Sequence, residues 1–165
     1  MTPEFSRPVR AAPPEGGLSC QVEASAAECA ALAARMALPG IDALACAWQL
    51  SPLPGEAAGR LLGRGRLRAR LRLVCVVTLE EFPVALEEEF TVYFVPAGSE
   101  AAEDDPEAPD EIPYAGAVID LGEAAAEQLA LAIDPYPRKP GAALPAPEAP
   151  RPNPFAVLQG RRRPA

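Results

Sequence analysis

The chain has 165 residues, a net charge of −8 and 49% apolar residues, which suffice for one domain with a single buried core. It contains no histidine, which excludes imidazole-dependent catalytic triads and most catalytic zinc sites. No apolar run is long enough for a membrane span and the N-terminus lacks a signal-peptide pattern, so we expect a soluble, cytoplasmic protein without a membrane partner.

Proline defines the expected domain boundaries. The 21 prolines crowd both ends of the chain, where they disfavour regular helix and sheet. We therefore expect a flexible N-terminal arm over residues 1–16, a folded domain over 17–134 and a Pro-rich tail over 135–165. Within this tail Phe155, Val157 and Leu158 follow a proline-rich linker, which favours a docking segment over residues 153–158, either for its own domain or for a partner. A disordered end is the alternative.

The first part of the domain alternates strand and helix patterns. Residues 18–22 predict a short strand, and Ser25 with Glu28 forms the capping-box pattern that begins a helix. The helix should end before Pro39, because proline disfavours a helical residue ahead of it. Residues 41–50 then place apolar side chains at every second position, which predicts a strand.

A β-hairpin is predicted next, from residues 62–77 and 84–95 with a turn near 79–83. The first of these strands alternates arginine with small or apolar residues, so all its arginines should lie on one face. With the turn centred on Glu80 and Glu81, Arg72 would lie opposite Glu89. The next arginines along the strand would face Thr91, Tyr93 and Val95.

The remainder of the domain begins with an acidic stretch. Residues 97–111 hold seven acids and no basic residue, which favours a mobile acidic loop. Residues 118–119 predict a short strand, and Asp120 with Glu123 should cap a second helix over 121–133. The expected fold class is α+β: an antiparallel sheet of four or five strands with two covering helices and a Pro-rich extended C-terminal tail.

The arginine-rich strand is the strongest candidate binding site. Its guanidinium groups should grip successive phosphates of RNA or stack on unpaired bases. The arginine cluster at the C-terminus suits RNA phosphate as well. The alternative is a solvated face on which the arginines pair with glutamates across the hairpin. The candidate RNA-binding residues are Arg64, Arg66, Arg68, Arg70, Arg72, Arg161, Arg162 and Arg163.

Catalysis and metal binding find little support. Cys20, Cys29, Cys46 and Cys75 lack the close spacing of zinc or redox sites and have apolar neighbours, so we expect buried thiols and no metal. The acidic runs are of the surface type, and no glycine-rich phosphate loop is present. We expect a non-enzymatic protein with no cofactor and no small-molecule substrate.

Several segments together resemble the YceD-like family, in its alphaproteobacterial type. They are Leu73-Val74-Cys75-Val76-Val77-Thr78-Leu79-Glu80-Glu81-Phe82, Glu88-Glu89-Phe90-Thr91-Val92, Asp110-Glu111-Ile112-Pro113-Tyr114, Ile119-Asp120-Leu121, Asp134-Pro135-Tyr136-Pro137-Arg138-Lys139-Pro140 and Pro152-Asn153-Pro154-Phe155-Ala156-Val157-Leu158. The resemblance implies a role in the synthesis, processing or stability of 23S rRNA and in assembly of the large ribosomal subunit. Many family members carry Cys-x-x-Cys at the hairpin turn. Here Cys75 is kept and Thr78 takes the second position, which argues against a metal.

Two hypotheses remain for the partner. The first is binding of large-subunit rRNA or a pre-ribosomal particle through the arginines. The second is an acidic chaperone or adaptor that shields a basic large-subunit ribosomal protein through acids in residues 100–111. Charge segregation permits both, because residues 60–72 carry six positive charges and residues 80–111 carry twelve negative ones.

Overall fold

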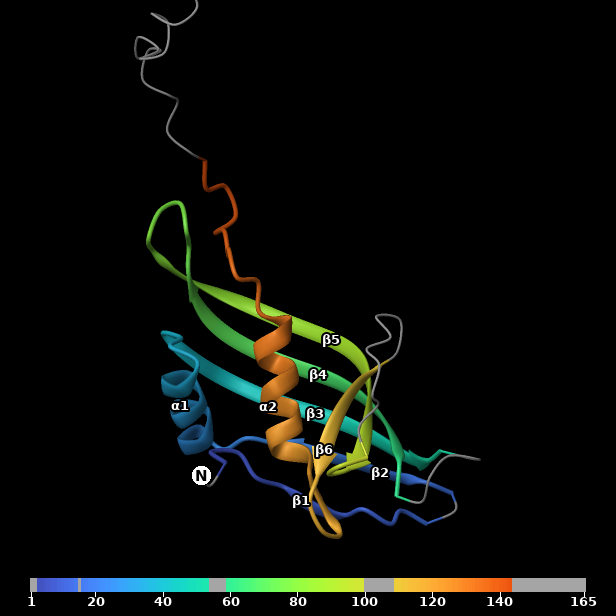
Figure 1. Cartoon of the computed structure of the whole chain (residues 1–165). Coiled ribbons are helices and arrows are strands. Elements are labelled where there is room, and N and C mark those ends of the chain that lie inside the picture. Colours follow the sequence, from blue (N-terminus) through green and yellow to red (C-terminus); the bar gives the residue numbers. More distant parts are fainter. Residues whose placement is uncertain (1–2, 15, 54–58, 100–108, 144–165) are drawn as a thin grey trace, which may run out of the picture.

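The computed structural model describes residues 3–14, 16–53, 59–99 and 109–143 (Figure 1). A five-stranded sheet of order β2-β3-β4-β5-β6 stands beside a two-stranded sheet of β1 and β7. The elements are β1 (Pro8–Arg10), β2 (Leu18–Glu23), α1 (Ala26–Arg35), β3 (Gly40–Pro52), β4 (Leu61–Val74), β5 (Glu81–Pro96), β6 (Asp110–Tyr114), β7 (Val118–Asp120) and α2 (Leu121–Ala132). The α+β class is confirmed, and the large sheet is antiparallel except that β6 lies parallel to β5.

One face of the large sheet forms the core. Figure 1 shows α2 lying across the central strands, where Leu121, Ala125 and Leu129 are fully buried in the same cluster as Leu67 and Leu71 of β4. The opposite side chains of the central strands are exposed or half-buried, as the alternating burial along β4 shows. We call this second surface, formed by the outward residues of β2, β3, β4 and β5, the open face.

Both predicted helix caps are confirmed. The Ser25 backbone N–H donates to the Glu28 carboxylate at 2.7 Å and the Glu28 N–H donates to the Ser25 hydroxyl at 3.3 Å, which completes the capping box. The Asp120 carboxylate accepts from the backbone N–H groups of Gly122 and Glu123, at 3.0 and 3.2 Å. Each helix therefore begins where its local sequence signal places it.

The expected flexible arm over residues 1–16 is wrong for residues 5–10, which pack on the domain. Phe5 is fully buried, and residues 8–10 form β1 against β7. Arg7 donates two hydrogen bonds to the Glu28 carboxylate, at 2.7 and 2.9 Å, and its pairing lowers the pKa of Glu28 to about 2. Proline did not prevent this strand, because β1 is an edge strand in which a missing N–H is tolerated.

The hairpin turn also departs from the prediction. It lies over residues 75–80, where the Leu79 N–H donates to the Cys75 carbonyl and the Cys75 N–H donates to the Glu80 carbonyl, each at 2.9 Å. Phe82 and Pro83, expected in the turn, belong to β5. The pairing of β4 with β5 is consequently displaced: Arg72 lies opposite Pro83, and Glu89 lies opposite Arg66.

The predicted loop over residues 97–111 is wrong at its C-terminal end, and its residues 100–108 lie outside the described residues. Asp110 and Glu111 belong to β6, which pairs with β5 from Val92 to Pro96. The Tyr114 hydroxyl donates to the Gly59 carbonyl at 2.6 Å, and Glu111 pairs with Arg60. These contacts to distant residues fix a segment that its local charge alone assigned to a loop.

We predict that Phe5→Ala lowers the free energy of unfolding by about 3–5 kcal/mol, because it empties a fully buried aromatic site. Urea denaturation followed by circular dichroism would measure the change. Arg10→Ala is the control: its side chain is exposed in the same segment, and the expected change is within about 0.5 kcal/mol. Equal unfolding midpoints for Phe5→Ala and the parent would contradict the packing of the N-terminal segment.

We predict that one thiol ionises near neutral pH. A hydrogen bond with the Thr78 side chain, followed by backbone contacts, lowers the pKa of Cys75 to about 7, whereas burial raises the pKa of Cys46 to about 12. The folded state thus favours the Cys75 thiolate, and the resulting stability is present above the unfolded pKa of about 8.5 and is lost as pH falls through about 7.

The ultraviolet absorbance of the thiolate, followed across a pH series, would measure this ionisation. Cys75→Ser should remove the step near neutral pH, and Thr78→Val should move it to higher pH. A step that Cys75→Ser leaves in place would assign the ionisation to another thiol and contradict the prediction.

Candidate nucleic-acid interface

The predicted arginine face is present on β4. Arg64, Arg66, Arg68, Arg70 and Arg72 are all exposed on the open face, while the residues between them point into the core. The alternation follows from the strand geometry, in which successive side chains point to opposite faces. The same-face arginines therefore repeat at about 6.8 Å along the strand.

The register of this strand is set on its buried side. A Cβ atom at Gly65 would lie 2.1 Å from the Phe90 ring, so only glycine lets that ring lie against β4. Phe90 in turn meets the Trp48 ring edge to face, with centroids 5.1 Å apart. Gly65, which interrupts the arginine and leucine pattern, thus has a packing role that the sequence interpretation did not identify.

Acidic residues on neighbouring strands engage three of the five arginines. Arg66 forms an ion pair with Glu89, and Arg68 with Glu87 at 3.0 Å, each directly across the β4–β5 ladder. Arg72 approaches Asp42 of β3 at 3.4 Å. These side chains are about half exposed or more, so the pairs are open to solvent and to competing anions.

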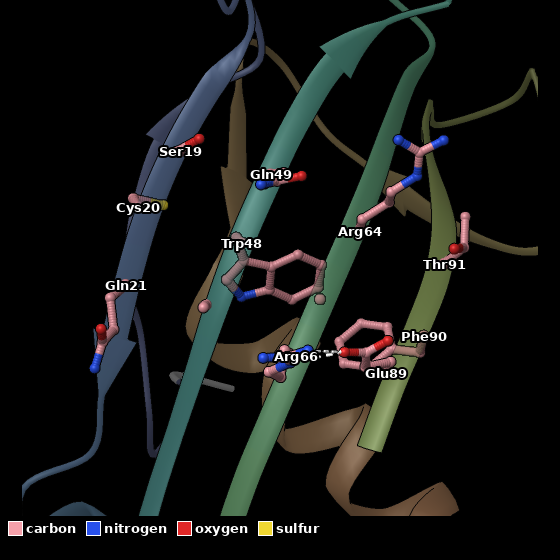
Figure 2. Close-up of a pocket in the computed structure, with 12 residues that line it drawn as sticks. Ser19, Cys20, Gln21, Trp48, Gln49, Arg64, Arg66, Glu89, Phe90 and Thr91 are labelled. Carbon is pink, nitrogen blue, oxygen red and sulfur yellow. Dashed lines mark hydrogen bonds and ion pairs between the residues drawn. The ribbon is translucent and has the colours of Figure 1, made fainter. Parts of the chain in front are cut away.

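The other two arginines lie outside these pairs. Arg64 lies between Gln49 and Thr91, and Arg70 lies between Ala43 and Ala85. Within residues 3–14, 16–53, 59–99 and 109–143, neither has an acidic residue at ion-pair distance. In Figure 2 a dashed line joins Arg66 to Glu89, whereas none joins Arg64 to another residue drawn.

The open face is hollowed along β3. Three successive outward residues of this strand are small, namely Ala43, Ala45 and Ala47, and they lie between the longer side chains of β2 and β4. One hollow of about 860 Å³ contains Arg64 and Arg66 among its lining residues, together with Gln21 and Gln49 (Figure 2). A second, of about 740 Å³, is lined in part by Arg68 and Arg70. The alternating alanines of β3 indicate this hollow in the sequence, but the prediction from sequence did not use them.

The remaining predicted residues lie elsewhere. Arg161, Arg162 and Arg163 and the docking residues Phe155, Val157 and Leu158 fall outside the described residues. Three of the predicted buried thiols, Cys29, Cys46 and Cys75, are buried, and Cys20 is half-buried. The described ranges contain no group of three or more histidine, cysteine or acidic residues that would hold a metal ion. They also contain no helix long and apolar enough to cross a membrane.

A comparison with protein-family models assigns the chain. The model described as "Large ribosomal RNA subunit accumulation protein YceD" matches residues 63–159, which is more than half of the sequence. The chain belongs to the YceD family. The match covers nearly all of β4 with its five arginines, then β5, α2 and the segment of residues 153–158.

Searches of curated proteins and of solved structures found no match. The description of the YceD family ties it to accumulation of the RNA of the large ribosomal subunit, and it describes no catalytic activity. The elements before residue 63, including β2, α1 and β3, lie outside the family match.

Proposed function

We propose that this YceD family member supports large ribosomal subunit assembly by binding large-subunit rRNA, or a pre-ribosomal particle, through the open face. The observation that carries the proposal is the row of five exposed arginines on β4, on the side of the sheet away from α2. The family's description supplies the RNA, and the arginines supply the chemistry that recognises its phosphates.

The composition of the open face favours contacts with the RNA backbone. Proteins that read unpaired bases stack them on aromatic rings. Among the described outward residues of β2 to β5, Tyr93 near one end of the face is the single aromatic residue. Guanidinium groups repeated at about 6.8 Å and flanked by alanines instead form a track for successive phosphates.

The ion pairs on this face are compatible with the proposal. An exposed ion pair is weak because water screens both charges, whereas RNA offers several phosphates at once and releases counterions when it binds. Arg64 and Arg70 flank the paired Arg66 and Arg68 along the strand, so two cations that have no acid at ion-pair distance within the described ranges frame the site. The function is non-enzymatic, needs no cofactor and takes place in the cytoplasm.

We predict that Arg64→Gln/Arg70→Gln weakens binding to large-subunit rRNA fragments. It should flatten the slope of log affinity against log salt by about 1–2, because each lost phosphate contact removes about one unit. A salt series of filter-binding or fluorescence-anisotropy measurements would show the change. Both side chains are exposed, so circular dichroism should report an unchanged fold.

Arg10→Gln/Arg138→Gln is the matched control, because it removes the same charge from two exposed arginines that lie outside the open face. This control should keep the parent affinity and salt slope. If the open-face variant is folded and binds RNA with the parent affinity and slope, the site assignment is wrong. Equal losses in the two variants would attribute the binding to net charge.

We further predict that Glu87→Gln/Glu89→Gln strengthens RNA binding. The change removes the two carboxylates that compete with phosphate for Arg66 and Arg68, and it leaves amides of the same size. The same binding assay would show a higher affinity and a steeper salt slope. Glu80→Gln/Glu81→Gln, an equal charge change at the end of the hairpin, provides the control. Affinity that rises equally in both variants would contradict a local effect.

A specific observation also favours a second candidate function. The chain carries a net charge of −8, and Glu87, Glu88 and Glu89 are consecutive exposed acids on β5. Such a strand suits an adaptor for a basic large-subunit ribosomal protein. Binding of a purified basic ribosomal protein, together with no binding of rRNA across the same salt series, would select this function over the first.

A further inference from the structure

The outer edge of β5 is only partly covered. Along its whole length β5 pairs with β4 on one side, but on the other side β6 pairs only with Val92 to Pro96. Within the described part of the chain, residues 81–91 have no strand on that side. Backbone N–H and C=O groups of this stretch are therefore available to a further strand.

An apolar groove lies beside this free edge. It has a volume of about 370 Å³ and is lined by residues of β4, β5 and the end of α2, together with Asp134 and Arg138. Val84 and Leu86 of β5 contribute half-buried side chains to it. Charged side chains such as glutamates protect an exposed strand edge from pairing with another strand. An apolar groove next to the edge instead favours contact with an apolar segment.

The end of the described chain lies next to the start of β5. The Pro137 carbonyl accepts from the Val76 N–H at 2.9 Å, and Lys139 pairs with Glu80 at 3.0 Å. Ala142 packs against the core. From there the eleven residues 144–154 span up to about 36 Å when extended. This reach is ample for a return along β5.

The sequence beyond residue 143 has the chemistry that the edge and the groove require. Phe155 and Val157 are two residues apart, so an extended backbone places both side chains on the same side. Arg161, Arg162 and Arg163 follow this apolar segment, and β5 carries three consecutive glutamates, Glu87 to Glu89, so the two stretches have opposite charges. The family match extends through residue 159 and thus includes this segment together with β5.

We propose that residues 153–158 dock on the chain's own β5 as an added strand parallel to it. Phe155 and Val157 fill the apolar groove over Val84 and Leu86, and in this register Arg161 follows just beyond Glu89. A short linker gives a tethered segment an effective concentration in the millimolar range, which favours this occupant over a free peptide of the same chemistry.

The test measures amide hydrogen exchange by nuclear magnetic resonance in the full chain, without RNA. In the parent, amides within residues 84–90 that point away from β4 should be protected. Phe155→Asp/Val157→Asp should accelerate their exchange by about tenfold or more, because each carboxylate would have to enter an apolar groove. Amides of α1 and β3 should keep their rates and report an intact fold.

Ala146→Asp/Ala149→Asp is the matched control, because it adds the same two charges to the linker and should leave the β5 amides protected. Equal exchange of these outward amides in the parent and in Phe155→Asp/Val157→Asp would overturn the proposal. Protection that grows with protein concentration would assign the groove to the tail of a second copy and would overturn the intramolecular docking. This experiment measures amide exchange in the absence of RNA, so its outcome does not depend on whether the protein binds RNA.

Discussion

The contact on which the sheet depends is the packing of Phe90 against Gly65 and Trp48. The Phe90 ring occupies the space that a side chain at position 65 would take, and its edge-to-face contact with Trp48 ties β5, β4 and β3 together through the buried side of the sheet. A one-residue slip would turn every core side chain to solvent and every arginine to the core. The close packing at this glycine favours the observed register, in which Glu89 meets Arg66 and Glu87 meets Arg68.

Local signals predicted both helices and the strands β2, β3, β4, β5 and β7, but they missed β1 and β6 and did not predict the pairing of β4 with β5. The capping residues Ser25 and Asp120 begin both helices, and period-two alternation identified β3, β4 and β5. The β4–β5 register failed because the turn was centred on the two glutamates at 80 and 81. The actual turn is organised by the Cys75 sulfur, which accepts from the Val77 and Thr78 N–H groups at 3.4 Å, and by Leu79 in a left-handed conformation. Neither feature involves proline, glycine or asparagine, the residues by which turns are usually recognised in a sequence.

The N-terminal segment shows a second limit of local reasoning. Asp120 was recognised as a helix cap, yet its carboxylate also accepts from the Arg7 backbone N–H at 2.7 Å and from the Ser6 hydroxyl. Gly122 allows the Phe5 carbonyl to approach α2 closely, since a Cβ atom there would lie 2.5 Å from that oxygen. These partners are more than a hundred residues apart, so no window of sequence contains both. The proline content of the N-terminal segment suggested a flexible arm, because composition carries no information about these distant partners.

The placement of the arginines on one face of β4 was predicted correctly from the sequence, and the local charges show how an acidic chain is compatible with the proposed binding of an anion. At physiological ionic strength the Debye length is about 8 Å, so exposed charges beyond the neighbouring strands are largely screened. What a phosphate meets on β4 is therefore decided by the acids across the ladder, Glu87 and Glu89, and by Asp42 on β3. The net charge of −8 mainly reflects carboxylates elsewhere, including the nine acids from Glu80 to Glu111 other than Glu87, Glu88 and Glu89. Local pairing across the β4–β5 ladder thus weighs more than the overall charge in the electrostatics of the open face.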